Sequence, residues 1–347
     1  MQGNECKVTI GMPVYNVEDY IVKCLSTSLE QDLDRVEVLI VDDCGTDKTM
    51  SIIKQMAKTH PQGNRIRIIK HEKNKGVAEA RNTILREAKG KYIYFQDPDD
   101  FIEPHTLSIL FDTAETNNAQ LTYGSMLILE RNGEKKPFMI LKKTILKGKD
   151  ALVNFIYSDI HENIPLSSCN ILIRTDFIRK NHISFPSIKI GEDLLFNEQI
   201  QPLVTSAVLL PNITYIYQKR PNSLMQYQSR DVIDIQEAYG SIKYAELRKQ
   251  YCNNVKDKSY YDVKCAKTMK HAFYTVCGIL NHRHQFNGQI PDKEIRNVMR
   301  HPSKLIEIIK FKHQKGTNLT FWLLGILPPS ISISLIKIIG KKKGFIR

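Results

Sequence analysis

Short apolar runs alternate with amphipathic stretches along the first hundred residues of the chain. The apolar runs occupy residues 8–12, 36–41, 65–70 and 92–95. Runs of this length, with little alternation of polar residues, are typical of parallel strands that are buried on both faces. The pattern therefore predicts a wound, mainly parallel sheet with helices on both faces.

The stretches between these runs have apolar residues at helical spacing. We expect Asn16 to cap the first helix, and Thr46 or Asp47 to cap the second. A third helix is predicted over residues 77–88. The apolar positions that recur every four residues in the first helix are Ile21, Leu25 and Leu29.

A different pattern follows the first hundred residues. A helix after Pro104 leads into two strand-like runs separated by a polar turn, which predicts an antiparallel extension of the sheet. From about Asp231 the chain is helical and richly charged. We therefore predict an α/β domain over residues 1–225 and a mainly helical C-terminal region over residues 226–347.

Carboxylates gather at two of the predicted strand ends. Asp42 and Asp43 follow one apolar run, and Asp97, Asp99 and Asp100 follow another. Ligands of wound sheets bind outside the carboxyl ends of the strands. Turn formation or helix capping would explain either group alone. Together they indicate a nucleoside-diphosphate site, with one acid pair for the nucleoside and the other for metal and diphosphate.

A divalent metal is the expected cofactor of the second group. Neighbouring acids repel one another unless a cation neutralises them, and Mg²⁺ or Mn²⁺ prefers oxygen ligands. The sequence contains neither a G-x-G-x-x-G after its first strand nor a P-loop motif. The phosphate chemistry would therefore fall to Mn²⁺ or Mg²⁺.

Positive charge is concentrated at the C-terminal end. The chain has 347 residues and a net charge of +13, and residues 300–347 hold eight Lys and two Arg against Glu307 alone, a net +9. Nucleic acid, an anionic membrane and a phosphorylated substrate are the candidate partners. Because the aromatic residues there are not arranged as a base-stacking platform, we expect no nucleic-acid partner.

The seven cysteines form no CxxC pair and are expected to be reduced thiols.

Residues 316–336 are uncharged and raise the question of a membrane span. Pro328 and Pro329 would interrupt a spanning helix, so we expect a segment at the membrane surface. Phe321 and Trp322 would lie at headgroup level, and Lys341 to Lys343 would attract anionic lipid. The alternative is a helical hairpin packed on the catalytic domain. With no secretory leader at the N-terminus, we expect a cytoplasmic protein, peripheral on the inner face of the plasma membrane.

Six segments carry a family resemblance. The sequence resembles the family-2 inverting glycosyltransferases of bacterial surface polysaccharide synthesis, which have the A-type fold and use nucleotide-diphospho-sugars. The resemblance covers roughly residues 7–225. Its segments are IGMPVYNVEDYI (10–21), VLIVDDCGTDKT (38–49), NKGVAEARN (74–82), YFQDPDDFIEP (94–104), GEDLLF (191–196) and YQKRPNS (217–223).

The resemblance implies roles for the residues that bind the donor. Residues 1–103 would bind the nucleotide sugar, and residues 104–225 would form the acceptor side. Pro13, Tyr15 and Glu18 would line the nucleoside pocket. Asp43, with Asp42, would hold the base and ribose.

The resemblance also implies which residues meet the diphosphate. Arg81 would approach the phosphate or ribose, although a surface arginine is the plain alternative. Asp97 and Asp99 would match the metal-binding D-x-D motif, and Asp100 would contact the sugar or the metal shell. Arg220 would close over the diphosphate.

Asp193 would be the catalytic base. It would deprotonate the acceptor hydroxyl during a single in-line displacement that inverts the anomeric configuration. Glu192 is the lesser candidate, and helix capping by this pair is the alternative.

Taken together, the sequence predicts an enzyme that moves a sugar, with UDP-sugars as the favoured donors, onto a glycan or lipid-linked glycan. Two other hypotheses stay open. One is a non-catalytic glycan- or nucleotide-binding protein with this fold, and the other is a metal-dependent nucleotidyltransferase.

Overall fold

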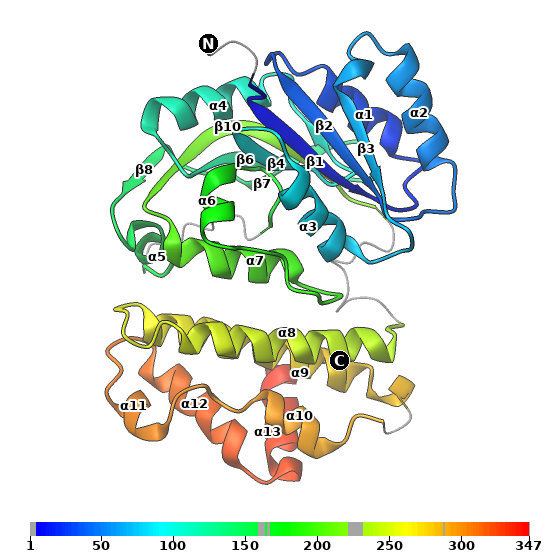
Figure 1. Ribbon diagram of the computed structural model, residues 1–347. Helices are drawn as coiled ribbons and strands as arrows, with labels where there is room; N and C mark the ends of the chain where they lie inside the picture. Colours follow the sequence, from blue (N-terminus) through cyan, green and yellow to red (C-terminus); the bar gives the residue numbers. More distant parts are fainter. Residues whose placement is uncertain (1–4, 159–163, 165–166, 221–231, 287–288, 347) are drawn as a thin grey trace. The chain divides into compact units, whose positions relative to one another are not determined.

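The chain forms two compact units (Figure 1). The first comprises Met1–Ile156, Ile160–Ser187 and Glu192–Pro221, and the second comprises Tyr157–Asp159, Ile188–Gly191 and Asn222–Arg347. The computed structural model describes residues 5–158, 164, 167–220, 232–286 and 289–346. The boundary predicted near residue 225 lies outside the described residues.

A ten-stranded mixed sheet forms the centre of the first unit. Its strand order is β3-β2-β1-β4-β9-β6-β10-β5, with β7 paired to β6 and β8 paired to β10. The strands are β1 (Val8–Val14), β2 (Val36–Asp42), β3 (Ile66–Lys70), β4 (Tyr92–Phe95), β5 (Phe101–Ile102), β6 (Leu121–Leu129), β7 (Lys135–Met139), β8 (Thr144–Lys147), β9 (Ile171–Arg174) and β10 (Ser206–Gln218). The first four strands are parallel, whereas β9 runs antiparallel to β4 and β6. The predicted wound α/β sheet with an antiparallel extension is confirmed.

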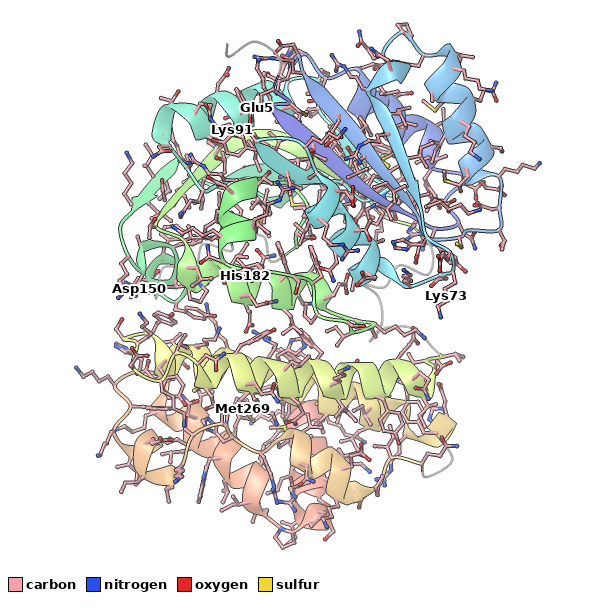
Figure 2. The ribbon with its side chains drawn as sticks, viewed as in Figure 1. Glu5, Lys73, Lys91, Asp150, His182 and Met269 are labelled. Carbon is pink, nitrogen blue, oxygen red and sulfur yellow. The ribbon has the colours of Figure 1, made fainter. Side chains whose placement is uncertain are left out.

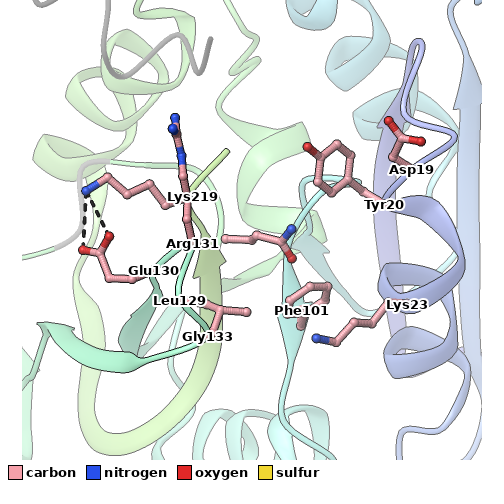
Figure 3. A pocket seen from close by; sticks show the side chains of 10 residues that line it. Asp19, Tyr20, Lys23, Phe101, Leu129, Glu130, Arg131, Gly133 and Lys219 are labelled. Atoms are coloured by element: carbon pink, nitrogen blue, oxygen red, sulfur yellow. Dashed lines mark hydrogen bonds and ion pairs between the residues drawn. The ribbon is translucent and has the colours of Figure 1, made fainter. Parts of the chain in front are cut away.

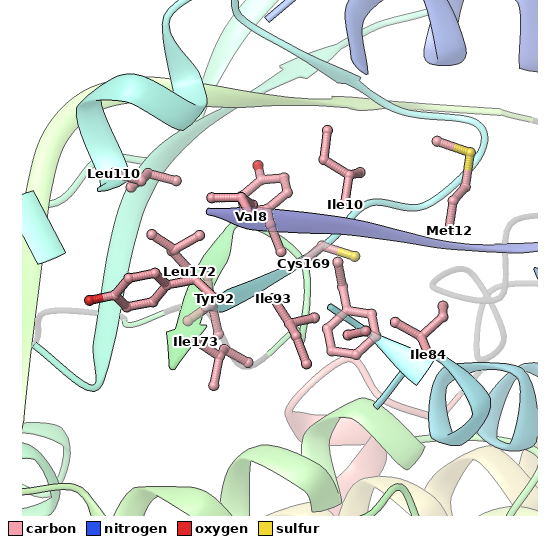
Figure 4. Close-up of a cluster of buried hydrophobic side chains, with 14 of the residues drawn as sticks. Val8, Ile10, Met12, Ile84, Tyr92, Ile93, Leu110, Cys169, Leu172 and Ile173 are labelled. Carbon is pink, nitrogen blue, oxygen red and sulfur yellow. The ribbon is translucent and has the colours of Figure 1, made fainter. Parts of the chain in front are cut away.

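The apolar runs form strands because both faces of the sheet are covered. All seven residues of β1 are buried, as expected for a strand between two helical layers. Figure 4 shows Val8 and Ile10 among side chains of β4 and β9, with Ile84 of helix α3 nearby. The helices of this unit are α1 (Ile21–Leu29), α2 (Thr49–Thr59), α3 (Val77–Glu87), α4 (Thr106–Asn117), α5 (Ala151–Ile156), α6 (Thr175–Lys180) and α7 (Glu192–Ile200), with short 3₁₀ helices η1 (Gly63–Arg65) and η2 (Gln201–Leu203).

The predicted cap of the first helix was wrong. Helix α1 begins only at Ile21, and Asn16 has a left-handed backbone with φ of 48°. The Asn16 Oδ1 accepts hydrogen bonds from the backbone N–H groups of Thr46, at 2.7 Å, and Asp47, at 3.4 Å. Asn16 therefore ties the loop after β1 to the loop after β2. The predicted cap of the second helix was also wrong, because the N-cap residue of α2 is Lys48. Asp47, one residue earlier, still accepts a hydrogen bond from the Thr49 N–H at 3.0 Å through its Oδ1.

The second unit is helical, as predicted. Its described helices are α8 (Ile235–Asn253), α9 (Tyr261–Asn281), η4 (Arg283–Phe286), α10 (Asp292–Val298), α11 (Leu305–Ile309), α12 (Lys315–Ile326) and α13 (Pro329–Lys342). Met269 of α9 is fully buried in the core of this unit (Figure 2). The Sγ atoms of Cys252 and Cys265 lie 3.1 Å apart between α8 and α9. Among the described residues, no helix has both the length and the hydropathy needed to cross a membrane.

Candidate active site

The loop between β4 and β5, residues 96–100, holds three of the predicted acids. It leaves the sheet at the carboxyl end of β4, which pairs with β1 from Tyr92 to Phe95. Asp42 ends β2 on the other side of β1, paired with Val14. Because parallel strands carry their carboxyl ends to the same edge, the two acid groups lie at one edge of the sheet. We call residues 96–100 the acid loop.

Asp100 fastens the acid loop to the end of β10. Its Oδ2 accepts the Tyr215 hydroxyl at 2.7 Å, and its Oδ1 accepts the Gln218 backbone N–H at 2.8 Å. Burial, reinforced by the charges of Asp99 and Asp97, raises the pKa of Asp100 well above the usual range. Both oxygens thus already have protein donors, and the metal role predicted for Asp100 stays a prediction.

Asp97 and Asp99 each face an arginine. The Asp97 Oδ1 accepts from the Arg81 Nη2 at 2.8 Å, and about a third of the Asp97 side chain is exposed. Asp99 pairs with the Nε of Arg220 and is nearly buried. Burial, together with the charge of Asp97, raises the pKa of Asp99 to about 6. The acid loop therefore holds more negative charge than the protein fully compensates.

Arg81 joins the acid loop to the start of α7. Its guanidinium contacts the Oε1 of Glu192 at 2.6 Å and Asp97 at 2.8 Å, and lies 5.5 Å from the centre of the Phe185 ring. Burial disfavours the charged guanidinium, but the charges of Asp97 and Glu192 outweigh it and raise the pKa of Arg81. Arg81 is buried rather than exposed on the surface of α3, and its role at the site stays a prediction.

Asp193 lies next to this ion pair, in the first turn of α7. The Asp193 Oδ1 accepts the Leu194 N–H at 2.8 Å, and the residue is half-buried. Burial raises the pKa of Asp193 despite the opposing charge of Arg81. Burial also raises the pKa of Glu192, against Arg81 and with the charge of Asp193, to about 7. A carboxylate with a raised pKa is a stronger base than an exposed one, which suits proton transfer.

Asp43, just after the end of β2, binds the loop that leads into α3. Its carboxylate accepts the backbone N–H groups of Lys75 and Gly76, both at 2.8 Å, and contacts the His71 Nδ1 at 2.7 Å. Gly76 has a φ of 86°, a conformation that favours glycine. His71 was not predicted, and its position just after β3 is the one signal that could have identified it.

The other predicted nucleoside residues differ in what they offer. Asp42 is buried, and its Oδ1 accepts the Cys44 N–H at 3.0 Å. Pro13 is buried within β1, whereas the Tyr15 ring is 48% exposed. The Glu18 Oε2 accepts the Lys48 N–H at 2.8 Å, so Glu18 holds the start of α2. Tyr15 therefore presents the most available surface of this group.

A pocket of about 370 Å³ opens beside the acid loop (Figure 3). Phe101, the residue after Asp100, lines it together with Tyr20 and Lys23 of the α1 region. The guanidinium of Arg220, the partner of Asp99, lies 5.8 Å from the centre of the Tyr20 ring. This pocket could not be predicted from the sequence, because its walls come from four segments that are spread over about 200 residues of the chain. They are Asp19, Tyr20, Lys23, Phe101, Leu129, Glu130, Arg131, Gly133, Gln218 and Lys219.

The acid loop fits a divalent metal that takes few ligands from the protein. Across the described residues, no three His, Cys, Asp or Glu side chains form a metal-binding cluster. Mg²⁺ and Mn²⁺ commonly bind through one or two carboxylates and take substrate phosphates and water as further ligands. Asp97 and Asp99 offer hard oxygen donors, and a cation beside them would stabilise the ionised form of Asp99, whose pKa is raised by burial and by the charge of Asp97.

Comparison with known proteins agrees with this geometry. The first 349 residues of S. aureus TarS, solved in complex with UDP-GlcNAc, superpose with a TM-score of 0.67 at 20% identity, covering 92% of this chain and 90% of that one. This likeness shows the fold, and the wound sheet is of the A-type glycosyltransferase fold. Residues 9–170, just under half of the chain, match the model of Glycosyl transferase family 2. The resemblance seen in the sequence is confirmed.

Two curated relatives support the assignment. GlyA of Streptococcus pneumoniae serotype 4, a glycosyltransferase, is 28% identical over 222 residues, which is 63% of this chain and 31% of GlyA. EpsJ of Bacillus subtilis (strain 168), an uncharacterized glycosyltransferase, is 26% identical over 257 residues, which is 73% of this chain and 70% of EpsJ. The chain thus spans about a third of GlyA but most of EpsJ.

Proposed function

We propose that this protein transfers a sugar from a nucleotide-diphospho-sugar to a hydroxyl of a glycan or lipid-linked glycan, with inversion, in bacterial surface polysaccharide synthesis. A UDP-sugar is the favoured donor, since TarS, which has the same fold, was solved with UDP-GlcNAc. The two acid groups at one sheet edge supply the separate nucleoside and diphosphate sites that such a donor needs.

The observation that carries the proposal is the position of Arg81 between the acid loop and α7. One guanidinium contacts Asp97 at 2.8 Å and Glu192 at 2.6 Å, and Asp193 follows Glu192 directly. Donor and acceptor chemistry have to meet at one carbon atom, so the leaving-group site and the base must be neighbours. A buried arginine that pairs with both sides supports that arrangement.

The chain's own residues then divide the work. The exposed ring of Tyr15 packs against the nucleoside. Asp42 binds it through Oδ2, because its Oδ1 already accepts the Cys44 N–H. Asp193 accepts the proton of the acceptor hydroxyl as the new C–O bond forms at the anomeric carbon. The old bond from that carbon to the phosphate oxygen breaks, and its electron pair leaves with the nucleoside diphosphate. Arg220 stands beside the departing charge.

Asp97 and Asp99 would hold the divalent metal. Bound there, Mn²⁺ or Mg²⁺ would supply neutralising charge for the leaving diphosphate. Asp100 keeps the loop in place through Tyr215 and Gln218.

The test is metal-dependent turnover of a panel of sugar nucleotides by the purified chain. We expect release of a nucleoside diphosphate and a product with inverted anomeric configuration by NMR. Asp193→Asn should retain donor binding but lose transfer at least a hundredfold, while Asp99→Asn should lose metal-dependent donor binding. Asp47→Asn is the matched control, because Asp47 supports a helix start.

Three outcomes would overturn the proposal. Pyrophosphate release would indicate a nucleotidyltransferase. Donor binding without turnover under any condition would indicate a non-catalytic binding protein. Full activity of Asp193→Asn would remove the assigned base.

A further inference from the structure

Helix α12 exposes an apolar stripe instead of burying it. Leu319 and Leu323, and Trp322 and Ile326, are four residues apart, and Leu319 precedes Trp322 by three, which places all four on one side of the helix. Leu323 and Ile326 are 46% and 53% exposed, and Leu319 and Trp322 are half-buried.

The opposite side of α12 packs against other helices of the second unit. Leu324 is buried, and the Phe321 ring lies 5.9 Å from that of Phe273 in α9. The Arg296 Nη1 donates to the Gly325 carbonyl at 2.9 Å. Phe321 therefore belongs to the core of the unit, which leaves Trp322 as the aromatic residue of the exposed stripe.

The two helices packed against α12 also expose apolar side chains. In α11, Ile306 and Ile309 are exposed, and in α13, Ile331 and Ile338 are exposed. The uncharged stretch from residue 316 to 336 covers most of α12 and α13. A surface that received the α12 stripe and Ile331 would therefore meet no charged residue of this stretch.

Lysines border this surface with almost no compensating acid. Eight lysines of residues 300–347 are exposed, and Glu307 is the one acid of that segment. Glu307 is already held by the Lys304 backbone N–H at 2.7 Å and by Lys256 at 3.6 Å. The exposed lysines are Lys304, Lys310, Lys312, Lys315, Lys337, Lys341, Lys342 and Lys343.

We infer that α11–α13 form a docking surface for an anionic lipid bilayer, with the α12 stripe inserted at headgroup depth. Lysine is depleted at the centres of protein interfaces, whereas lysine around apolar and tryptophan side chains suits the headgroup region. Twelve residues of α12 span about 18 Å, well short of the roughly 30 Å hydrocarbon layer, so the helix lies in the interface.

Trp322 makes the docking directly measurable, because it is the single tryptophan of the sequence. The full chain is mixed with vesicles of phosphatidylcholine alone or with 30% phosphatidylglycerol. We expect flotation with the anionic vesicles, a blue shift of tryptophan emission and quenching by brominated lipids. High salt should weaken all three, because the lysine contribution is screened.

Matched variants separate the apolar and the electrostatic parts. Leu323→Ser/Ile326→Ser should lower the partition coefficient roughly tenfold or more, and Val22→Ser/Ile140→Ser, equally exposed in the first unit, should not. Lys341→Gln/Lys342→Gln should lower binding to anionic vesicles by roughly tenfold or more, and Lys54→Gln/Lys58→Gln should not. Melting temperature and donor hydrolysis confirm that each variant is folded.

Two results would overturn the inference. One is a full chain that neither floats nor shifts its emission with the anionic vesicles. The other is a blue-shifted emission without lipid accompanied by a dimer in sedimentation equilibrium, which would show that a second copy covers the stripe. Because the readout is lipid binding, its failure leaves the proposed sugar transfer untouched.

Discussion

Asp99→Asn should make the metal-free protein more stable at pH 8, although it removes a proposed functional group. Burial and the charge of Asp97 raise the pKa of Asp99 from 3.8 to about 6. A raised carboxyl pKa means that the folded state holds its proton more tightly than the unfolded state does. The stability contributed by this group is present below the unfolded pKa and is lost as the pH rises through about 6.

The size of the effect follows from that shift. At pH 8 the charged carboxylate costs at most about 3 kcal/mol relative to a neutral side chain, and at pH 5 the cost is roughly half as large. The charge of Arg220, whose side chain is 35% exposed, already lowers this pKa, so the shift to about 6 includes the loss of that pairing. A gain of at most about 3 kcal/mol corresponds to a rise of at most roughly 6–12 °C in melting temperature for a unit of this size.

Calorimetry in a chelator at pH 5 and pH 8 measures the difference. The gain of Asp99→Asn over the parent should be larger at pH 8, and saturating Mn²⁺ should stabilise the parent but not the variant. Asp47→Asn is a control for which we expect the opposite change in melting temperature. Burial opposes the charge of Asp47, but hydrogen bonds from Thr49 and the Glu18 backbone outweigh it and lower its pKa, so the variant should melt earlier at both pH values. A loss of stability in Asp99→Asn that is equal at both pH values would refute the reasoning.

Three further predictions address the rest of the molecule. Arg81→Ala should destabilise the first unit by about 3–5 kcal/mol in urea unfolding, because Asp97 and Glu192 lose a buried partner, and Arg86→Ala on the exposed side of α3 should change little. The ratio kcat/KM should fall as the pH drops through the raised pKa of Asp193, with an acidic limb above 3.8, since the protonated base cannot accept a proton; a flat profile down to pH 4 would contradict the assignment. Treatment with hydrogen peroxide should join Cys252 to Cys265 in a disulfide detectable by non-reducing peptide mass spectrometry, because their Sγ atoms are 3.1 Å apart, whereas Cys277 should stay reduced.

The sequence predicted the parallel half of the sheet well, for a physical reason. Strands such as β1 are buried on both faces, and that burial requires an uninterrupted apolar run that can be recognised without any structure. Helix starts were predicted less well. The side chain of Asn16 accepts a hydrogen bond from the Thr46 N–H, 30 residues away, instead of capping α1. A local capping rule cannot detect a partner at that distance.

The same limit applies to the site. The acids could be identified from the sequence because they follow strands. The residues that each acid contacts could not be predicted. Arg81 pairs with a residue 111 positions later, and Asp100 with one 115 positions later. The apolar C-terminal stretch was visible in the sequence, but only the packing of Phe321 and Leu324 shows which side of α12 stays open.

The contact of Arg81 with both Asp97 and Glu192 also bears on the order in which substrates add. A ligand that draws Arg81 away from Asp97 would also change its contact with Glu192, the residue before Asp193. Binding of the donor beside the acid loop would thereby alter the surroundings of the group that activates the second substrate. Steady-state kinetics should accordingly follow an ordered sequence, donor before acceptor.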